Sequence, residues 1–180
     1  MRGFGGFVNG CIFALALLIG LAFGAVQSGL VPANADSKPN RIERWLAHTS
    51  LEVAIARGSK DLQNPLQASD DNLIAGVHLY GANCAVCHGA ADAKQSNPAK
   101  GFYIRSPALA KDGVEDDPES ETFWKVKHGI RYTAMPSFGA TLSDADIWKL
   151  AMFLKRMDKL DPQVDAEWKK IPSAATAASP

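Results

Sequence analysis

Two cysteines near the middle of the chain are separated by two residues and followed at once by a histidine. The motif reads Cys84-Ala85-Val86-Cys87-His88. Two thiols at this spacing can reach the two vinyl groups on one edge of a porphyrin, and the adjoining imidazole can then meet the iron from one face. The pattern is typical of covalent c-type haem attachment. The sequence therefore predicts one haem c, bound through Cys84 and Cys87 and ligated by His88.

A zinc site and a redox-active dithiol are two other uses of such a cysteine pair. Zinc would need further Cys or His ligands at metal spacing. The nearest candidates are His78 and His128, and the sequence has no second cysteine pair. A thioredoxin-type dithiol belongs in a strand–helix–strand setting, whereas the residues around Cys84 have helical patterns. Both alternatives are therefore disfavoured relative to haem attachment.

The sixth position on the iron requires a donor from later in the chain. Met135 is the best candidate, because it lies in a loop and is followed by Pro136, which would fix the backbone beside the ligand. A thioether paired with an imidazole raises the reduction potential of a haem. His128 is the rival, since two histidines also ligate haem iron, although its place at a helix end favours a structural or solvated role. Met152 and Met157 are expected in the core, and His48 and His78 at the surface or between helices.

An apolar run occupies the start of the chain, from Gly3 to Val26, with Asn9 as its only strongly polar residue. Roughly 20 apolar residues span a bilayer as a helix, so we expect a retained transmembrane anchor. A cleaved signal peptide is the alternative, because Ala33-Asn34-Ala35 has the form of a cleavage site. In both cases the rest of the chain is expected to be exported, where haem is attached to such motifs. Cys11 lies inside the apolar run and is expected to act as a small hydrophobic residue.

Apolar residues at helical spacing predict an amphipathic helix over 41–57, capped by Asn40. We expect this helix to pack on the main domain, with docking on another membrane subunit as the alternative. Its apolar residues are Ile42, Trp45, Leu46, Thr49, Val53 and Ala56.

Three further helices complete the predicted all-α fold. One begins at Ser69 or Asp70 and runs into the cysteine motif, one covers 118–128 after Asp117 as N-cap, and one begins at Ser143. Residues 90–117 form a long irregular stretch, which a large prosthetic group would organise.

These boundaries define four expected segments. They are an anchor or signal peptide over 1–31, a linker and amphipathic helix over 32–68, a haem domain over 69–160, and a disordered tail rich in Ala, Ser and Pro over 161–180.

Residues 69–159 resemble the class I (monohaem) cytochrome c family in its compact bacterial form. The matching positions are Gly76, Tyr80 and Cys84 in the first helix, Leu150 and Phe153 in the last helix, and Gly129, Met135 and Pro136 in the distal loop. In that family the two helices cross closely, and the glycine permits their contact. The resemblance implies an α-helical fold around the haem with His88 and Met135 as axial ligands. It covers about half of the chain and leaves residues 1–60 and 161–180 unmatched.

The formal net charge is zero, from 19 basic and 19 acidic residues, which gives no indication of nucleic-acid binding. A haem with ligands on both faces has no vacant position for a substrate. We therefore expect a one-electron carrier rather than an enzyme, acting alone or as a cytochrome subunit of a larger redox complex. A labile Met135 would instead allow peroxidase activity or gas sensing.

The expected partners are redox proteins or a membrane redox complex. The haem domain is expected in the periplasm, either anchored to the membrane or soluble after signal cleavage. Basic residues near the two motifs could steer an acidic partner, although an acidic run over 112–121 would weaken such a face. These basic residues are Lys94, Lys100, Arg105, Lys111, Lys125, Lys127 and Arg131.

Overall fold

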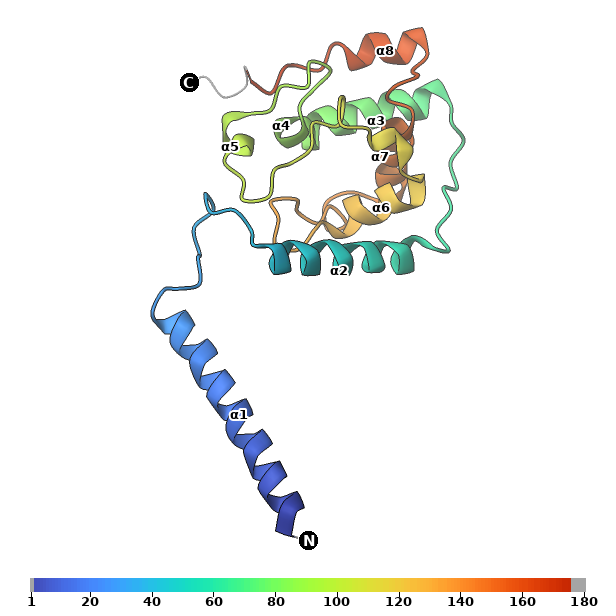
Figure 1. Ribbon diagram of the computed structural model, residues 1–180. Helices are drawn as coiled ribbons and strands as arrows, with labels where there is room; N and C mark the ends of the chain where they lie inside the picture. The colour runs from blue at the N-terminus through green and yellow to red at the C-terminus, as the bar shows by residue number, and fades with distance from the viewer. Residues whose placement is uncertain (1, 176–180) are drawn as a thin grey trace. The chain divides into compact units, whose positions relative to one another are not determined.

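The computed structural model describes residues 2–175, and the regular structure in that part of the chain is entirely helical (Figure 1). This confirms the predicted all-α fold. The chain divides into two compact units, residues 1–37 and residues 38–180.

The first unit contains one long helix, α1 (Arg2–Gln27). Its segment Phe4–Gln27 is 24 residues long and apolar enough to cross a membrane. A retained anchor and a cleaved signal peptide share this length and composition. The large apolar side chains of the helix, such as Phe7, Leu18 and Phe23, are exposed.

The second unit contains the remaining helices. These are α2 (Arg41–Ser59), α3 (Asp70–Asn83), α4 (Ala85–His88), α5 (Asn97–Lys100), the 3₁₀ turn η1 (Val114–Asp116), α6 (Glu119–His128), α7 (Asp144–Lys155) and α8 (Pro162–Trp168).

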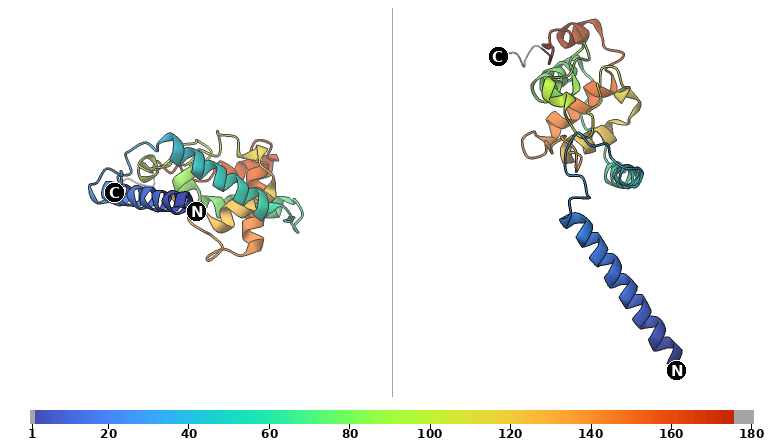
Figure 2. Two further views of the ribbon diagram at one scale, coloured as in Figure 1. Left: turned by 60° about the horizontal axis from the view of Figure 1, so that its bottom comes forward. Right: turned by 60° about the vertical axis from the view of Figure 1, so that its left-hand side comes forward.

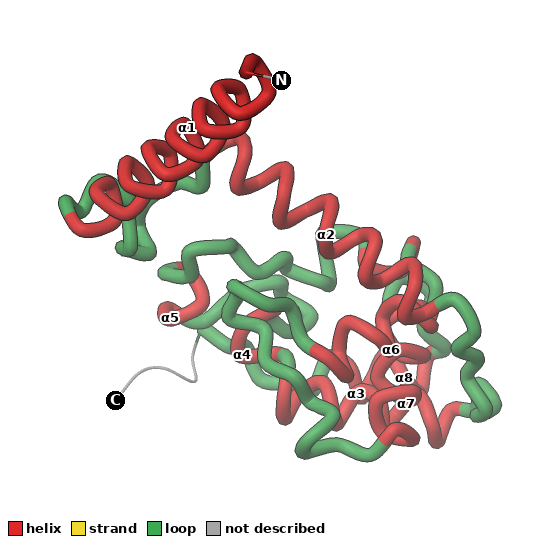
Figure 3. Tube along the Cα trace, turned by 90° about the horizontal axis from the view of Figure 1, so that it is seen from below, coloured by secondary structure: helices red, strands yellow, loops and turns green. Residues whose placement is uncertain are grey.

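The core of this unit forms where α3 and α6 pack on α7. Gly76 of α3 sits against the backbone of α7, and a Cβ atom built there would lie 2.4 Å from the carbonyl oxygen of Lys149. Phe123 of α6 stacks on Trp148 of α7 with ring centroids 4.0 Å apart. Figure 3 shows these helices gathered on one side of the unit, while α4, α5 and long loops occupy the other side. The packed helices thus support the loops.

Hydrogen bonds at the helix starts match the sequence pattern at three of four sites. Asn40, Ser69 and Ser143 each accept a backbone N–H three residues later. Asp117 was expected to cap α6, but the N-cap is Pro118 and the helix begins at Glu119. The Asp117 carboxylate instead accepts a bond from Lys125 Nζ at 2.6 Å. This ion pair draws the carboxylate away from the N–H groups that a capping residue would bind.

The segment that follows α7 is not a disordered tail at its start, contrary to the sequence prediction. Residues 162–168 form α8, and its Val164 and Trp168 are buried in the core. The Trp168 ring makes edge contacts with Tyr80 and Phe153 at centroid distances of 5.2 Å. Two buried apolar side chains compensate for the ordering of a segment whose composition otherwise favours disorder. Residues 176–180 of the expected tail lie outside the described part of the chain.

Helix α2 packs on the main domain, as predicted, but through a different face. Ile55 and Ser59 are buried, and Gly58 lies against the indole of Trp124 in α6. In contrast, the predicted stripe points to solvent at Ile42, Trp45, Leu46, Thr49, Val53 and Ala56. Figure 2, in its right-hand view, shows α2 end-on at one side of the second unit. The helix therefore has one docked face and one exposed apolar face.

Candidate functional site

The helices and loops of the second unit enclose a cavity of about 420 Å³. Cys84, Cys87, His88 and Met135 all line it. The volume lies within the range of about 300–1,000 Å³ that is usual for cofactor sites, and most of the other lining residues are apolar, as in such sites. The structure thus brings together all four residues that the sequence predicts for the site, although His88 and Met135 are 47 positions apart in the chain.

The cysteine motif is positioned by the end of α3 and the short helix α4. Cys84 N–H donates to the Tyr80 carbonyl at 2.8 Å, and His88 N–H donates to the Cys84 carbonyl at 2.9 Å. The buried Tyr80 hydroxyl donates to the Gly89 carbonyl at 2.7 Å. Both ends of the motif are therefore tied to α3.

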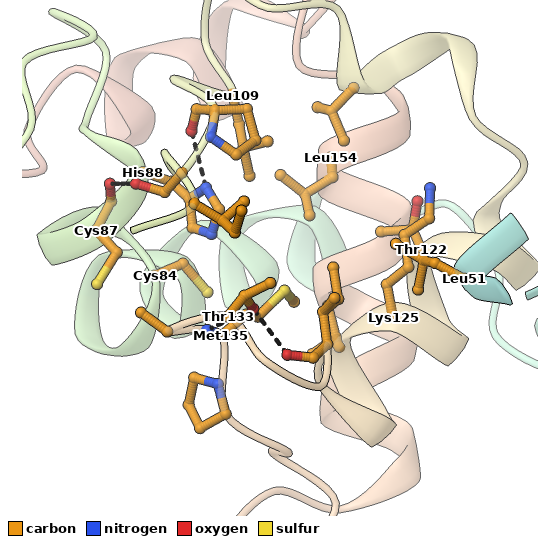
Figure 4. A pocket seen from close by; sticks show the side chains of 18 of the residues that line it. Leu51, Cys84, Cys87, His88, Leu109, Thr122, Lys125, Thr133, Met135 and Leu154 are labelled. Carbon is orange, nitrogen blue, oxygen red and sulfur yellow. Dashed lines mark hydrogen bonds between the residues drawn. The ribbon is translucent and has the colours of Figure 1, made fainter. Parts of the chain in front are cut away.

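His88 presents one defined tautomer toward the cavity. Its Nδ1 lies 2.8 Å from the Pro107 carbonyl oxygen (Figure 4). Because a carbonyl can only accept a hydrogen bond, Nδ1 carries the proton and Nε2 keeps its lone pair. Such a bond to the second ring nitrogen is the usual device that orients a histidine ligand. Burial lowers the pKa of His88, and the bond to Pro107 acts in the opposite sense. The neutral, metal-binding form of the ring is therefore favoured.

The irregular stretch after the motif is held to it by side-chain hydrogen bonds. Gln95 Nε2 donates to the carbonyls of Cys87 and Ser106, at 2.9 and 2.8 Å. The Ser106 hydroxyl also donates to the Cys87 carbonyl at 2.8 Å. These bonds fix the loop next to Pro107, the acceptor for His88, and so the loop closes one wall of the cavity.

The Met135 loop forms another wall. Its ends are joined by a bond from Ile130 N–H to the Met135 carbonyl at 3.2 Å, and Met135 N–H donates to the Thr133 hydroxyl at 3.1 Å. Gly129 opens the loop with a φ of +67°, and a Cβ there would lie 2.6 Å from the Pro136 carbonyl carbon. A side chain at this position would be both strained and obstructed. Figure 4 shows the side chains of His88, Met135 and Cys84 around one space.

The pKa values of both thiols in the motif are raised. Burial raises the pKa of Cys84 to about 12, and the nearby Cys87 adds to this shift. Burial also raises the pKa of Cys87. Reactive dithiols have lowered pKa values instead. Within residues 2–175, moreover, no group of three or more His, Cys, Asp or Glu side chains is placed to hold a metal ion. The raised pKa values do not favour the dithiol interpretation.

The other histidines differ in their relation to the cavity. His128, the rival ligand, is exposed against the ring of Trp124 and does not line the cavity. His78 is exposed, with Nε2 3.6 Å from a Glu167 oxygen. His48, which was expected at the surface or between helices, is an exposed residue of α2 that also lines the cavity.

Helix α2 therefore contributes a wall that the sequence analysis missed. Its lining residues are His48, Leu51, Glu52 and Ile55. They recur at intervals of three or four residues, so they share one face of the helix. The same spacing is visible in the sequence. The prediction instead used the neighbouring stripe, because that stripe is more apolar.

Two of the seven basic residues proposed as a steering face line the cavity, Arg105 and Lys125. Lys125 pairs with Asp117 at 2.6 Å and with Glu121 at 3.9 Å. Lys127 pairs with Asp144 at 2.7 Å. These carboxylates reduce the net positive charge that a partner would meet at Lys125 and Lys127.

The fold and the cavity together define the class of the second unit, a cytochrome c domain. The donor set fits a covalently held haem, because two thiols, an oriented imidazole and a thioether line one largely apolar cavity. Residues 71–154 match the family described as "Cytochrome C oxidase, cbb3-type, subunit III".

A curated relative also matches the chain in part. It is a thiosulfate dehydrogenase of Stutzerimonas stutzeri (strain A1501), 29% identical over 94 residues. The matched region covers 52% of this chain and 30% of the relative, so the chain spans less than a third of that protein's length. No solved structure matches the chain.

The domain over residues 71–154 belongs to the class I cytochrome c family, which confirms the resemblance seen in the sequence. A domain of this family supports haem-based electron transfer and is usually periplasmic.

Proposed function

We propose that this protein is a one-electron carrier with a single haem c, attached through Cys84 and Cys87 and ligated by His88 and Met135. The observation that carries the proposal is the cavity lined by all four side chains. When bound there, a haem would supply an iron that gains and loses one electron without binding a substrate.

The residues around the cavity have distinct roles in this proposal. The Pro107 carbonyl holds the His88 ring in one tautomer, and Thr133 holds the backbone of Met135. Leu109, Val126 and Leu154 are among the apolar residues that line the cavity and exclude water. A pocket of low dielectric with a neutral sulfur donor favours the reduced iron and so a raised reduction potential. The chain itself thus tunes the potential through its ligands and its apolar wall.

The proposed location is the periplasmic face of a membrane, with α1 retained as an anchor. An apolar helix of membrane-spanning length precedes the domain and supports this arrangement. The partners would be redox proteins or a membrane complex that the tethered domain can reach. The matched family and the partial relative are both redox proteins by name, which favours such partners.

The test is an absorption spectrum of the full chain made together with haem-attachment machinery. We expect haem to stay with the denatured protein, and the folded oxidised protein to show the weak far-red band of a sulfur-ligated iron. Met135→Leu should retain the haem and lose that band. Met152→Leu is the matched control, because Met152 is buried in the core and does not line the cavity.

Each result bears on a separate part of the proposal. Haem that is released on denaturation would refute attachment through Cys84 and Cys87. A far-red band that persists in Met135→Leu would refute Met135 as the ligand. Intact mass of the membrane-extracted protein tests the anchor, because signal cleavage would remove about the first 35 residues.

A further inference from the structure

Helix α2 carries two faces with different surroundings. His48, Leu51 and Ile55 face the cavity. A second stripe lies about a third of a turn away around the helix axis. It consists of Ile42, Trp45, Leu46 and Val53, with 75%, 65%, 58% and 46% of their surfaces exposed.

Exposing several large apolar side chains of one helix to water is unfavourable in free energy. Ile55 and Ser59, on the other face, already provide the contact with the domain. The exposed stripe therefore adds nothing to the attachment of α2, and its composition requires another explanation.

The charges around the stripe are predominantly positive. Residues 38–60 contain five basic and two acidic residues, a net charge of +3. Both acidic side chains are engaged, since Glu43 accepts a bond from the Tyr103 hydroxyl and Glu52 lies 3.3 Å from His48. In contrast, Arg41 and Arg44 form no ion pair with any residue in the described part of the chain. Two cations are thus available to an anionic ligand.

A shallow hollow on the helix surface places these cations beside an aromatic ring. Its volume is about 290 Å³, and its lining residues are Arg41, Arg44, Trp45, His48 and Thr49. Arginine and tryptophan are the residues that concentrate at the boundary between headgroups and acyl chains. The hollow borders the apolar stripe through Trp45, so an anion held there would sit next to the apolar surface.

The chain also limits where α2 can be. Residues 28–40 link the end of α1 to the start of α2. Even fully extended, a linker of this length reaches only about 45–50 Å. If α1 spans a membrane, α2 stays within that distance of the bilayer surface.

We propose that the exposed stripe of α2 is a membrane-binding surface, which inserts among the headgroups of a bilayer that contains anionic phospholipid. This inference rests on the anchor of the proposed function. The apolar stripe enters the boundary of the acyl chains, while Arg41 and Arg44 bind lipid phosphates. A protein partner would also bury the stripe, but the unpaired arginines, the tryptophan and the short tether together fit a lipid surface.

The test uses the full haem-loaded chain in vesicles of phosphatidylcholine with or without phosphatidylglycerol. A nitroxide spin label is attached to the cysteine of Leu46→Cys in a Cys11→Ala background. The same label on Ala47→Cys is the matched control. The two positions are neighbours in α2, yet Ala47 is exposed on the side away from the stripe. In vesicles with phosphatidylglycerol, we expect the label at 46 to collide with oxygen and to be shielded from a water-soluble nickel complex. The label at 47 should remain open to the nickel complex.

Removal of the cations gives a second measurement. Arg41→Gln and Arg44→Gln should each lower the ratio of docked to undocked protein about fivefold, since a basic residue near an anionic surface contributes roughly that factor. Their haem spectra should be unchanged.

Three results would overturn the inference. Equal exposure of both labels to the nickel complex would exclude membrane contact. Shielding of position 46 from both oxygen and nickel would instead indicate burial against protein. Shielding that is the same with and without phosphatidylglycerol would exclude the role of the arginines. Haem retention and co-sedimentation with vesicles are measured on the same samples, so failure of the haem or of the anchor is recognised separately.

Discussion

Gly76 allows α3 to cross α7 at close range, and Gly76→Ala tests that contact. A Cβ atom at this position would lie 2.4 Å from the Lys149 carbonyl oxygen and 2.9 Å from the Phe153 Cβ. Neither atom belongs to the far end of a flexible side chain. The methyl group can therefore be accommodated only if the two helices move apart, which would loosen the core next to Tyr80.

The expected loss of stability is about 2 kcal/mol. Overpacking of a core costs typically about 1–3 kcal/mol, and a backbone obstacle places this case at the upper end. Alanine regains roughly 1 kcal/mol over glycine inside a helix. The net loss corresponds to a fall of roughly 5–10 °C in the melting temperature of a domain of this size.

Gly81→Ala is the matched control, because it adds the same methyl group to the same helix. The nearest atom there is Ile171 Cδ1 at 2.7 Å, the tip of a side chain that can rotate away. We expect this variant to be as stable as the unmodified protein or more stable by up to about 1 kcal/mol. The assay is urea unfolding of both haem-loaded variants, followed by circular dichroism. If the two variants unfold at the same midpoint, the argument from the close helix crossing is wrong.

Two further predictions concern the elements that the family match does not include. Trp168→Ala should destabilise the domain by about 3–5 kcal/mol, because the buried ring contacts Tyr80 and Phe153; an unfolding midpoint within error of the unmodified protein would contradict a structural role for α8. Gly58→Ala should loosen α2, because its Cβ would meet the Trp124 indole at 2.0 Å. Hydrogen exchange should rise in the amides of α2 and stay constant in those of α3, and equal protection of α2 in both proteins would show that the indole yields without moving the helix.

The structure explains why the sequence predicts the wrong docking face for α2. Periodicity reports which residues share a face of a helix, but it does not say which of two apolar faces meets the domain. The stripe with Ile42 and Trp45 is larger and more apolar than the face with Leu51 and Ile55. The docked face includes Gly58, where the missing side chain admits the Trp124 indole. No local pattern in the sequence encodes that contact.

The sequence fails to predict helix α8 at the start of the tail for a similar reason. Residues 161–180 are rich in Ala, Ser and Pro, and composition alone favours disorder. Val164 and Trp168 nevertheless order the first part of this segment, because both are buried in the core. The Trp168 ring fills a space beside Tyr80 and Phe153. Only the positions of those partners show that the space exists.

The sequence by itself determined the features that depend on short-range order: the helical class of the fold, three of the four expected caps, the apolar first helix and the spacing of Cys84, Cys87 and His88. Local hydrogen bonding and side-chain periodicity set these features, so neighbouring residues suffice to predict them. The tertiary structure decided what requires distant segments to meet. It placed Met135 at the cavity of His88, selected Pro107 as the partner of Nδ1, and made α2 a wall of the site. Such contacts follow from how whole helices pack, because the free energy of each one depends on surfaces that lie far apart along the chain.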